Sequence, residues 1–309
     1  MRAHPNILER CDFIQKLIAG MCARGCDDEA YALVNGCSGS VREAGMYAFF
    51  ANVSDDKGRA MDLLKVVSFD DLYPAMFGYM KGFDTGDLKA EVTSSRLDGL
   101  RDARRHDLPP GLIGDAVTSA LKDGLVDSGR DGAADILSFA RKLMADGVIK
   151  PYQVYEMVEG DENLGAFEKW EHLKGMEADA SNAGDRSVEL KLRGKVMAGM
   201  IDEDGSKAMD VILGDGSSER SADVDAALRH WTRVDPEGIN GWFQRKQAAL
   251  DPGMRAMIAT SLSATAAESG EYESAKQWAG QIQDPVARSG ALERVEETIL
   301  NHRKWLEEK

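Results

Sequence analysis

The residues best suited to chemistry are four cysteines, all within the first 37 residues. Cys11, Cys22, Cys26 and Cys37 are separated by eleven, four and eleven residues. Because eleven residues make almost whole turns of an α-helix, Cys11 and Cys22 share one helix face. A turn at residues 24–25 would fold the two segments antiparallel, which brings Cys22 near Cys26 and Cys11 near Cys37. The spacing therefore allows two disulfides across one helical hairpin.

Two other states of these cysteines remain open. Free Cys is commonly a small buried side chain at a tight packing interface, and we favour this interpretation. A zinc site made of all four cysteines fits worse, because structural zinc pairs its ligands two to four residues apart. Here the outer cysteines lie about 16 Å along a helix from the inner ones. Disulfides would indicate an extracytoplasmic protein.

A local reversal of charge is the second candidate site. Arg101, Arg104 and Arg105 lie just before Leu108-Pro109-Pro110 in an otherwise acidic chain. On a helix these three arginines share a face, which would suit an anion or an acidic peptide. We favour pairing with nearby Asp residues, because exposed basic residues of an acidic protein usually have such partners.

Aromatic residues near the C-terminus are the third candidate. Trp242 and Phe243 are adjacent, and Trp278 follows in the last part of the chain. Trp at helical spacing commonly packs in a core. Neighbouring residues of a helix point in different directions, however, so one of Trp242 and Phe243 should point away from what the other packs on. We therefore expect the C-terminal part to carry a partner surface with aromatic anchors.

The sequence contains no pattern of a known catalytic or cofactor site. The five histidines lie far apart, so the H-x-x-x-H and H-E-x-x-H spacings of helical metal sites are missing. P-loop, nucleophile-elbow and Rossmann fingerprints are absent from any usable context. Asp84-Thr85-Gly86 lies between helices, without the strands that an aspartic-protease triplet needs. We predict a protein that is not an enzyme, with no metal and no cofactor.

The elements that must position these residues are helices. In residues 14–21 the apolar side chains fall at i, i+3, i+4 and i+7, which is one face of a helix. Residues 44–50 and 196–201 show similar spacing. Runs rich in Val, Ile and Thr are too short to form strands. The predicted fold class is therefore all-α.

Composition narrows the function classes. The 309 residues are 43% hydrophobic and carry a net charge of −15. This acidity argues against a nucleic-acid binder, because phosphate contacts need clustered Lys and Arg. No apolar run approaches the roughly 20 residues needed to span a bilayer, which predicts no membrane insertion. The first six residues lack the apolar core of a signal peptide, so the default expectation is a cytoplasmic protein.

A recurring turn indicates an internal repeat. A segment rich in Gly and Asp precedes a small residue that opens an apolar helix, and these small residues are Ala30, Ala60, Ala90, Ala133, Ala166, Ala208, Gly238 and Ala275. The steps between them average about 35 residues, a period typical of stacked helical hairpins. Each hairpin in such an array buries its apolar face against its neighbours. We predict one α-solenoid of about eight hairpins over residues 1–309, with a possible subdivision near 105–111 and a C-terminal cap at 286–309.

Residues 270–279 carry a resemblance to a known family. The segment Gly-Glu-Tyr-Glu-Ser-Ala-Lys-Gln-Trp-Ala resembles the turn and second helix of a tetratricopeptide (TPR) repeat, where Gly-x-Tyr-x-x-Ala marks the turn. The wider chain resembles the divergent TPR-like and HEAT-like helical-repeat proteins of bacteria. This resemblance implies a superhelical scaffold that binds a protein or peptide, with its concave face as the binding surface, and no catalytic residues.

The acidic balance favours a basic partner. Two alternatives stay open. One is a regulatory or targeting subunit of a larger enzyme complex. The other is an enzyme whose site forms between distant repeats.

Overall fold

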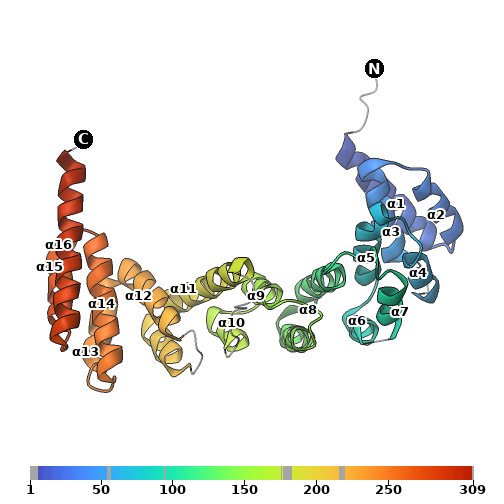
Figure 1. The fold of residues 1–309 in the computed structure, drawn as a ribbon. Coiled ribbons are helices and arrows are strands. Elements are labelled where there is room, and N and C mark those ends of the chain that lie inside the picture. Colours follow the sequence, from blue (N-terminus) through green and yellow to red (C-terminus); the bar gives the residue numbers. More distant parts are fainter. Residues whose placement is uncertain are drawn as a thin grey trace. The chain divides into compact units, whose positions relative to one another are not determined.

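The computed structural model describes residues 6–53, 57–93, 95–174, 176, 183–215 and 220–307. Every regular element in these ranges is a helix, which confirms the all-α prediction (Figure 1). No helix in the same ranges is long and apolar enough to cross a bilayer. Contacts divide the chain into two compact units, residues 1–157 and 158–309.

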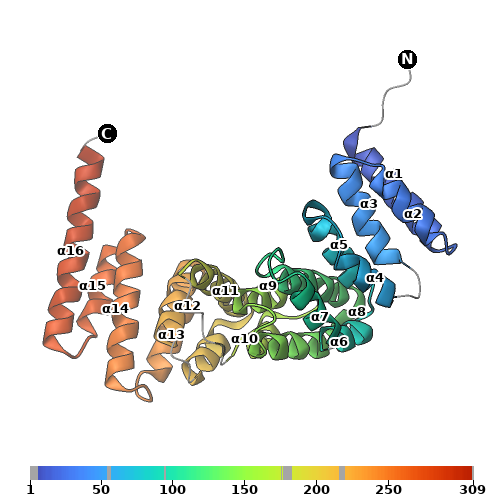
Figure 2. The same ribbon diagram turned by 45° about the vertical axis from the view of Figure 1, so that its right-hand side comes forward.

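The first unit alternates long and short helices. The long helices are α1 (Ile7–Cys22), α3 (Gly39–Asn52), α5 (Phe69–Lys81) and α8 (Leu112–Ala145), and the short ones are α2 (Asp27–Asn35), α4 (Lys57–Leu64), α6 (Thr85–Val92) and α7 (Ser95–Ala103). The long helices pack on one another in chain order, with α3 between α1 and α5, and α5 also against α8 (Figure 2). Helix α8 bends at Gly129, where φ is 60°. Helix α9 (Pro151–Gly160) contains the boundary between the units.

Local signals in the sequence explain where these helices begin. Asn6 and Glu9 form a capping box at the start of α1, because each side chain bonds the main-chain N–H of the other. The hydroxyl of Ser68 accepts from the Asp71 N–H at the start of α5. The carboxylate of Asp84 accepts from the Asp87 N–H at the start of α6. These caps satisfy main-chain donors that have no partner within the helix.

Two glycines four residues apart allow α5 to approach the main chain of α3. A Cβ at Gly78 would overlap the carbonyl oxygen of Tyr47, and one at Gly82 would lie 2.7 Å from the carbonyl oxygen of Ala51. The contact moves from Tyr47 to Ala51 on one segment as it moves from Gly78 to Gly82 on the other, so α3 and α5 run parallel. The short helix α4 returns the chain between them. The two long helices therefore pack with main chain against main chain.

The second unit is built in a similar way. It contains α10 (Ala166–Leu173), α11 (Ala183–Gly214), α12 (Arg220–Val234), α13 (Pro236–Lys246), α14 (Pro252–Glu268), α15 (Tyr272–Gly280) and α16 (Pro285–Glu307). Helix α11 bends at Asp204. Helix α12 packs on α11 and α14, and α14 packs on α15 and α16. The segment predicted as a cap begins one residue after α16 does, and its Ala291 and Val295 are buried.

The small residues that mark the predicted repeat differ in their surroundings. Five are fully buried, as close helix packing requires: Ala30, Ala60, Ala133, Ala208 and Ala275. Ala166 and Gly238 are half-buried. Ala90 is exposed, because the short helix α6 packs through Leu88 and Val92 instead.

Candidate partner-binding surface

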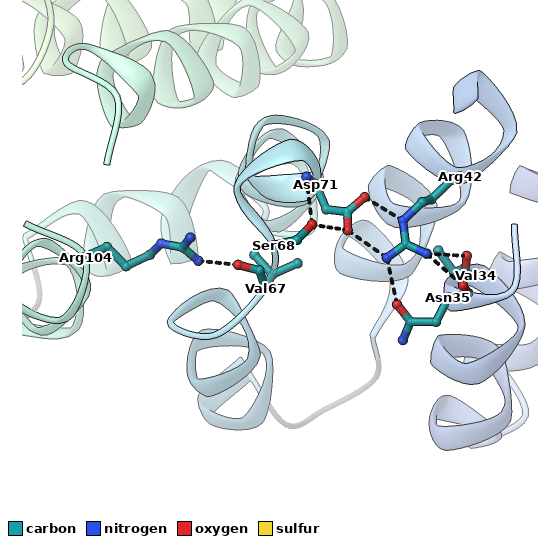
Figure 3. A network of polar contacts seen from close by, with 7 residues as sticks. All are labelled: Val34, Asn35, Arg42, Val67, Ser68, Asp71 and Arg104. Carbon is teal, nitrogen blue, oxygen red and sulfur yellow. Dashed lines mark hydrogen bonds and ion pairs between the residues drawn. The ribbon is translucent and has the colours of Figure 1, made fainter. Parts of the chain in front are cut away.

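Arg42 forms the centre of a polar network that joins three helices of the first unit (Figure 3). Its Nε and Nη2 donate to the two carboxylate oxygens of Asp71 on α5, each at 2.8 Å. Its Nη1 donates to the carbonyl oxygen of Asn35, the last residue of α2, at 2.8 Å. The guanidinium therefore satisfies a carbonyl that the end of α2 leaves without a helical donor. It also ties the start of α5 to α3.

Asp71 is held in its ionised form by this arrangement. The bidentate hydrogen bonds from Arg42 lower the pKa of its carboxyl group below the usual 3.8, against the opposing effect of burial. The hydroxyl of Ser68 also donates to this carboxylate. Ser68 and Asp71 lie on either side of Phe69, so the network fixes the first turn of α5, where an exposed row of aromatic residues begins.

We call this row the aromatic face: Phe69, Tyr73 and Phe77. Phe69, Tyr73 and Phe77 follow one another at intervals of four residues, so they lie along one side of α5. Phe69 and Tyr73 are 57% and 46% exposed, whereas Phe77 is half-buried. The Tyr73 and Phe77 rings stack with their centroids 6.5 Å apart. Large aromatic side chains are thus presented to solvent on a helix whose start is fixed.

Acidic and carbonyl groups border the aromatic face. Glu43, the fifth residue of α3, and Asp70, in the first turn of α5, are exposed, and neither has an ion pair among the residues that the structure describes. Pro74 has no N–H, so it cannot donate the helical hydrogen bond to the Asp70 carbonyl. Lys81, near the other end of α5, is already paired with Asp123 at 2.8 Å. The free groups at this border are therefore acceptors, which suit a basic partner.

The predicted arginine cluster does not share a face. Arg104 follows the end of α7 and is buried, where it donates to the carbonyl oxygen of Val67 (Figure 3). It also donates to the carbonyl oxygen of Leu64 and pairs with Asp107. Arg101 is exposed and pairs with Asp98 at 2.8 Å. Arg105 is exposed and bonds its neighbour His106. The helix stops at Ala103, so helical spacing does not extend to Arg104 and Arg105.

The expectation that one of Trp242 and Phe243 points away from the packing is wrong, because both are buried. Trp242 packs on Trp231 and donates from Nε1 to Asp210 at 3.2 Å. Phe243 packs on Trp278 with the ring centroids 5.5 Å apart. Helix α13 contacts α11 and α12, and Phe243 contacts Trp278 of α15. Because neighbours cover α13 on more than one side, two adjacent residues of this helix can both be buried. Trp278 is half-buried in the same packing.

All four cysteines are free thiols in the structure. Cys22 is buried, and Cys11, Cys26 and Cys37 are half-buried. The Cys11 thiol donates to the Ser40 carbonyl and the Cys37 thiol to the Leu33 carbonyl, both at 3.4 Å. Burial, with a contribution from Asp27, raises the pKa of Cys22 to about 12. Only Cys22 thus matches the favoured interpretation of a fully buried thiol.

A second arginine network lies in the core of the second unit. Arg193 donates to both carboxylate oxygens of Asp223 and to Asp215 at 2.7–3.0 Å. It also donates to the carbonyl oxygen of Leu173, the last residue of α10, at 3.2 Å. The Trp170 ring lies 4.5 Å from the guanidinium carbon. Its burial makes this network a structural element rather than a binding surface.

Other sites that could hold a ligand are few. Among the described residues no group of three or more His, Cys, Asp or Glu side chains is arranged to hold a metal ion. An apolar hollow of about 450 Å³ lies between α1 and α3, lined by Phe13, Ile14 and Val41 with Glu9 and Arg10. Phe13 is 66% exposed beside it. The first unit therefore exposes apolar surface on α1 as well as on α5.

Sequence reasoning missed Arg42, Asp71 and the aromatic face, although signals for each exist. Phe69, Tyr73 and Phe77 have helical spacing, which places them on one side of a helix. Arg42 and Asp71 are 29 residues apart, and Arg193 and Asp223 are 30 apart, close to the shortest steps of the predicted repeat. Comparison of the chain with protein-family models, with curated proteins and with solved structures finds no match.

Proposed function

We propose that this protein is a helical-repeat scaffold without enzymatic activity, which binds a basic protein or peptide on the aromatic face of α5. The observation that carries the proposal is the exposure of Phe69 and Tyr73 on a helix whose start is fixed by Arg42 and Asp71. Aromatic anchors of this kind supply much of the binding energy at protein interfaces.

The face is suited to binding because it requires little ordering. Phe and Tyr have few rotatable bonds, and the stacking of Tyr73 on Phe77 restricts both rings further. The free carboxylates of Glu43 and Asp70 would attract a basic segment and increase its rate of association at low salt. A partner with Lys or Arg beside apolar side chains would satisfy both parts of the surface.

We further propose that each unit is a stack of helical hairpins within a solenoid of about eight such hairpins. The packing of long helices in chain order supports this arrangement. So do the two arginine networks, because each arginine lies on a long helix and joins the end of the preceding short helix to the start of the following long helix, with arginine–aspartate spacings of 29 and 30 residues. A stack of this kind exposes one side of each long helix to a partner.

The experiment compares three baits in affinity capture from the native cell. The wild-type chain should retain a basic protein at low salt and release it as the salt concentration rises. The variant Tyr73→Ala/Phe77→Ala should capture at least tenfold less of this protein. The matched control Val126→Ala, at a site 79% exposed on α8, should retain it.

A direct titration with the purified partner should then show that Glu43→Gln/Asp70→Asn weakens binding and reduces its salt dependence. Equal capture by the wild-type chain and by Tyr73→Ala/Phe77→Ala would contradict the proposal. So would a partner whose binding is insensitive to salt.

A further inference from the structure

Arginines complete the ends of three short helices in this protein. Arg42 bonds the last carbonyl of α2, Arg104 that of α4, and Arg193 that of α10. Each of them also binds at least one aspartate carboxylate. The chain thus supplies both main-chain carbonyls and a carboxylate to each guanidinium.

Arg255 occupies a similar place but has no acceptor. It is the fourth residue of α14, as Arg42 is of α3, and it lies beside Gln247, which ends the short helix α13. Its Nε is shielded from solvent and has no hydrogen-bond partner among the described residues. The rest of its guanidinium likewise makes no hydrogen bond or ion pair within the described ranges.

The aspartate that would complete the pattern serves another purpose. Asp284 follows Arg255 by 29 residues, as Asp71 follows Arg42. Asp71 is the third residue of its helix, whereas Asp284 precedes α16 and accepts from the Ala287 N–H at 2.9 Å as its N-cap. Its carboxylate is therefore held at the helix end instead of reaching the guanidinium.

A hollow of about 250 Å³ lies where the missing acceptor would be. Arg255 and Asp284 line it, together with Gln247, Gln281, Gln283 and Phe243. Its lining offers a cationic donor, an anionic acceptor and three groups that both donate and accept.

We propose that this hollow binds the C-terminal carboxylate of a peptide at the terminal Nη groups of Arg255, the one arginine of the four without an aspartate partner among the described residues. A guanidinium binds a carboxylate through two parallel hydrogen bonds, which accounts for the need for Arg at this position. The amide N–H of the terminal residue would donate to Asp284, and the glutamines would bond the remaining peptide groups. This inference is independent of the aromatic face, because it concerns the second unit alone.

Asp284 also selects against other anions. A phosphate or sulfate carries up to two negative charges and no adjacent donor, so the Asp284 carboxylate would repel it. A peptide terminus carries one negative charge with an N–H two bonds away from the carboxylate carbon. The presence of both Arg255 and Asp284 in the lining therefore favours a peptide C-terminus over a simple anion.

The test is a titration of the intact chain, monitored by NMR, with two small probes. N-acetylglycine has a carboxylate and an adjacent amide, and N-acetylglycinamide replaces the carboxylate with a neutral amide. N-acetylglycine should shift the side-chain resonances of Arg255 and of the lining glutamines Gln247, Gln281 and Gln283, with saturation in the millimolar range. N-acetylglycinamide and inorganic phosphate should bind at least tenfold more weakly.

Two variants complete the test. Arg255→Gln should weaken N-acetylglycine binding at least tenfold without a loss of thermal stability, and the matched control Arg233→Gln removes the same charge from an exposed site and should bind as the wild type does. Equal binding of the acid and the amide, or no saturable binding of the acid, would overturn the proposal. A fall in melting temperature for Arg255→Gln as large as that for Arg42→Gln would also overturn it, since Arg255 would then be a structural residue.

Discussion

Arg42 in the first unit and Arg193 in the second have the same kinds of acceptor but differ in their exposure to water. The Arg42 side chain is 26% exposed, whereas Arg193 and both of its aspartates are at most 4% exposed. Arg193 compensates for its loss of hydration with two carboxylates, two main-chain carbonyls and the Trp170 ring. Arg42 keeps some hydration and needs a single carboxylate.

Burial changes how an arginine–aspartate network responds to the loss of one of its members. A buried charge costs several kcal/mol of hydration, so its partners must be complete for the fold to tolerate it. A partly exposed charge can exchange a lost partner for water. The Arg193 network should therefore be sensitive to every one of its members, whereas the Arg42 network should tolerate the loss of one.

The largest expected effect comes from breaking the buried network. Asp223→Asn should destabilise the second unit by about 3–5 kcal/mol, because it leaves a buried arginine without its bidentate partner. Urea unfolding followed by Trp fluorescence measures this change, since Trp170 contacts Arg193. Replacement of all three charges, in Arg193→Met/Asp215→Asn/Asp223→Leu, should recover much of the loss, because no buried charge is then left without a partner. A change below about 1 kcal/mol for Asp223→Asn would show that the network is not closed to water.

The next largest effect concerns the close approach of α5 to the main chain of α3 at Gly78. Gly78→Ala should destabilise the first unit by about 3 kcal/mol, because the new Cβ overlaps the Tyr47 carbonyl and forces α3 and α5 apart. Gly99→Ala is the matched control on α7. A Cβ there meets nothing within 4 Å, so helix propensity should make it neutral or stabilising by up to about 1 kcal/mol. Chemical denaturation monitored by circular dichroism measures the stability of both variants. If Gly78→Ala and Gly99→Ala changed the free energy of unfolding equally, the close packing of α3 on α5 would be wrong.

A smaller effect should appear when the Arg42 pair is broken, and it should depend on pH. Asp71→Asn should destabilise the first unit by about 1–2 kcal/mol at pH 7. The folded pKa of Asp71 is lowered, so its contribution is present above the unfolded value near 3.8 and is lost as the pH falls further. The difference between wild type and variant should therefore shrink below about pH 4. A difference that stays constant to pH 2 would exclude Asp71 ionisation as its source.

The last prediction concerns the reactivity of the four cysteine thiols in the first unit rather than its stability. With its pKa raised to about 12, Cys22 should react with iodoacetamide at pH 8 more slowly than Cys11, Cys26 and Cys37 by at least tenfold. Peptide mass spectrometry of protein alkylated for increasing times gives each rate. The same experiment on non-reduced protein counts free thiols. Four would support the free state, and none would indicate the two disulfides that the spacing allows.

The sequence predicts features that depend on neighbours along the chain. Apolar side chains at i, i+3, i+4 and i+7 suffice to predict the α1 helix, and a small residue after a turn correctly marks the buried Ala30 and Ala60. The stopping point of α7 was harder to predict, because no strong breaker lies between Arg101 and Arg104. That uncertainty placed three arginines on one face that they do not share.

Features that depend on contacts between distant segments were not predicted. Nothing near Arg42 in the sequence indicates that Asp71 will meet it, because the pairing requires the register of α3 on α5. Burial of both Trp242 and Phe243 likewise depends on what surrounds α13. The aromatic face was overlooked for the opposite reason, since Tyr73 and Phe77 have the same spacing as core residues and only the packing of α5 leaves them outside.

The close contact at Gly78 and Gly82 has a mechanical consequence. Helices that meet main chain to main chain have no interlocking side chains there, so this contact holds them together but resists sliding along their axes weakly. The Arg42–Asp71 pair, at the other end of the same two helices, supplies the missing axial lock. A force that pulls α5 lengthwise past α3 would therefore load this single ion pair first, and a helix freed from it could shift before it unfolds.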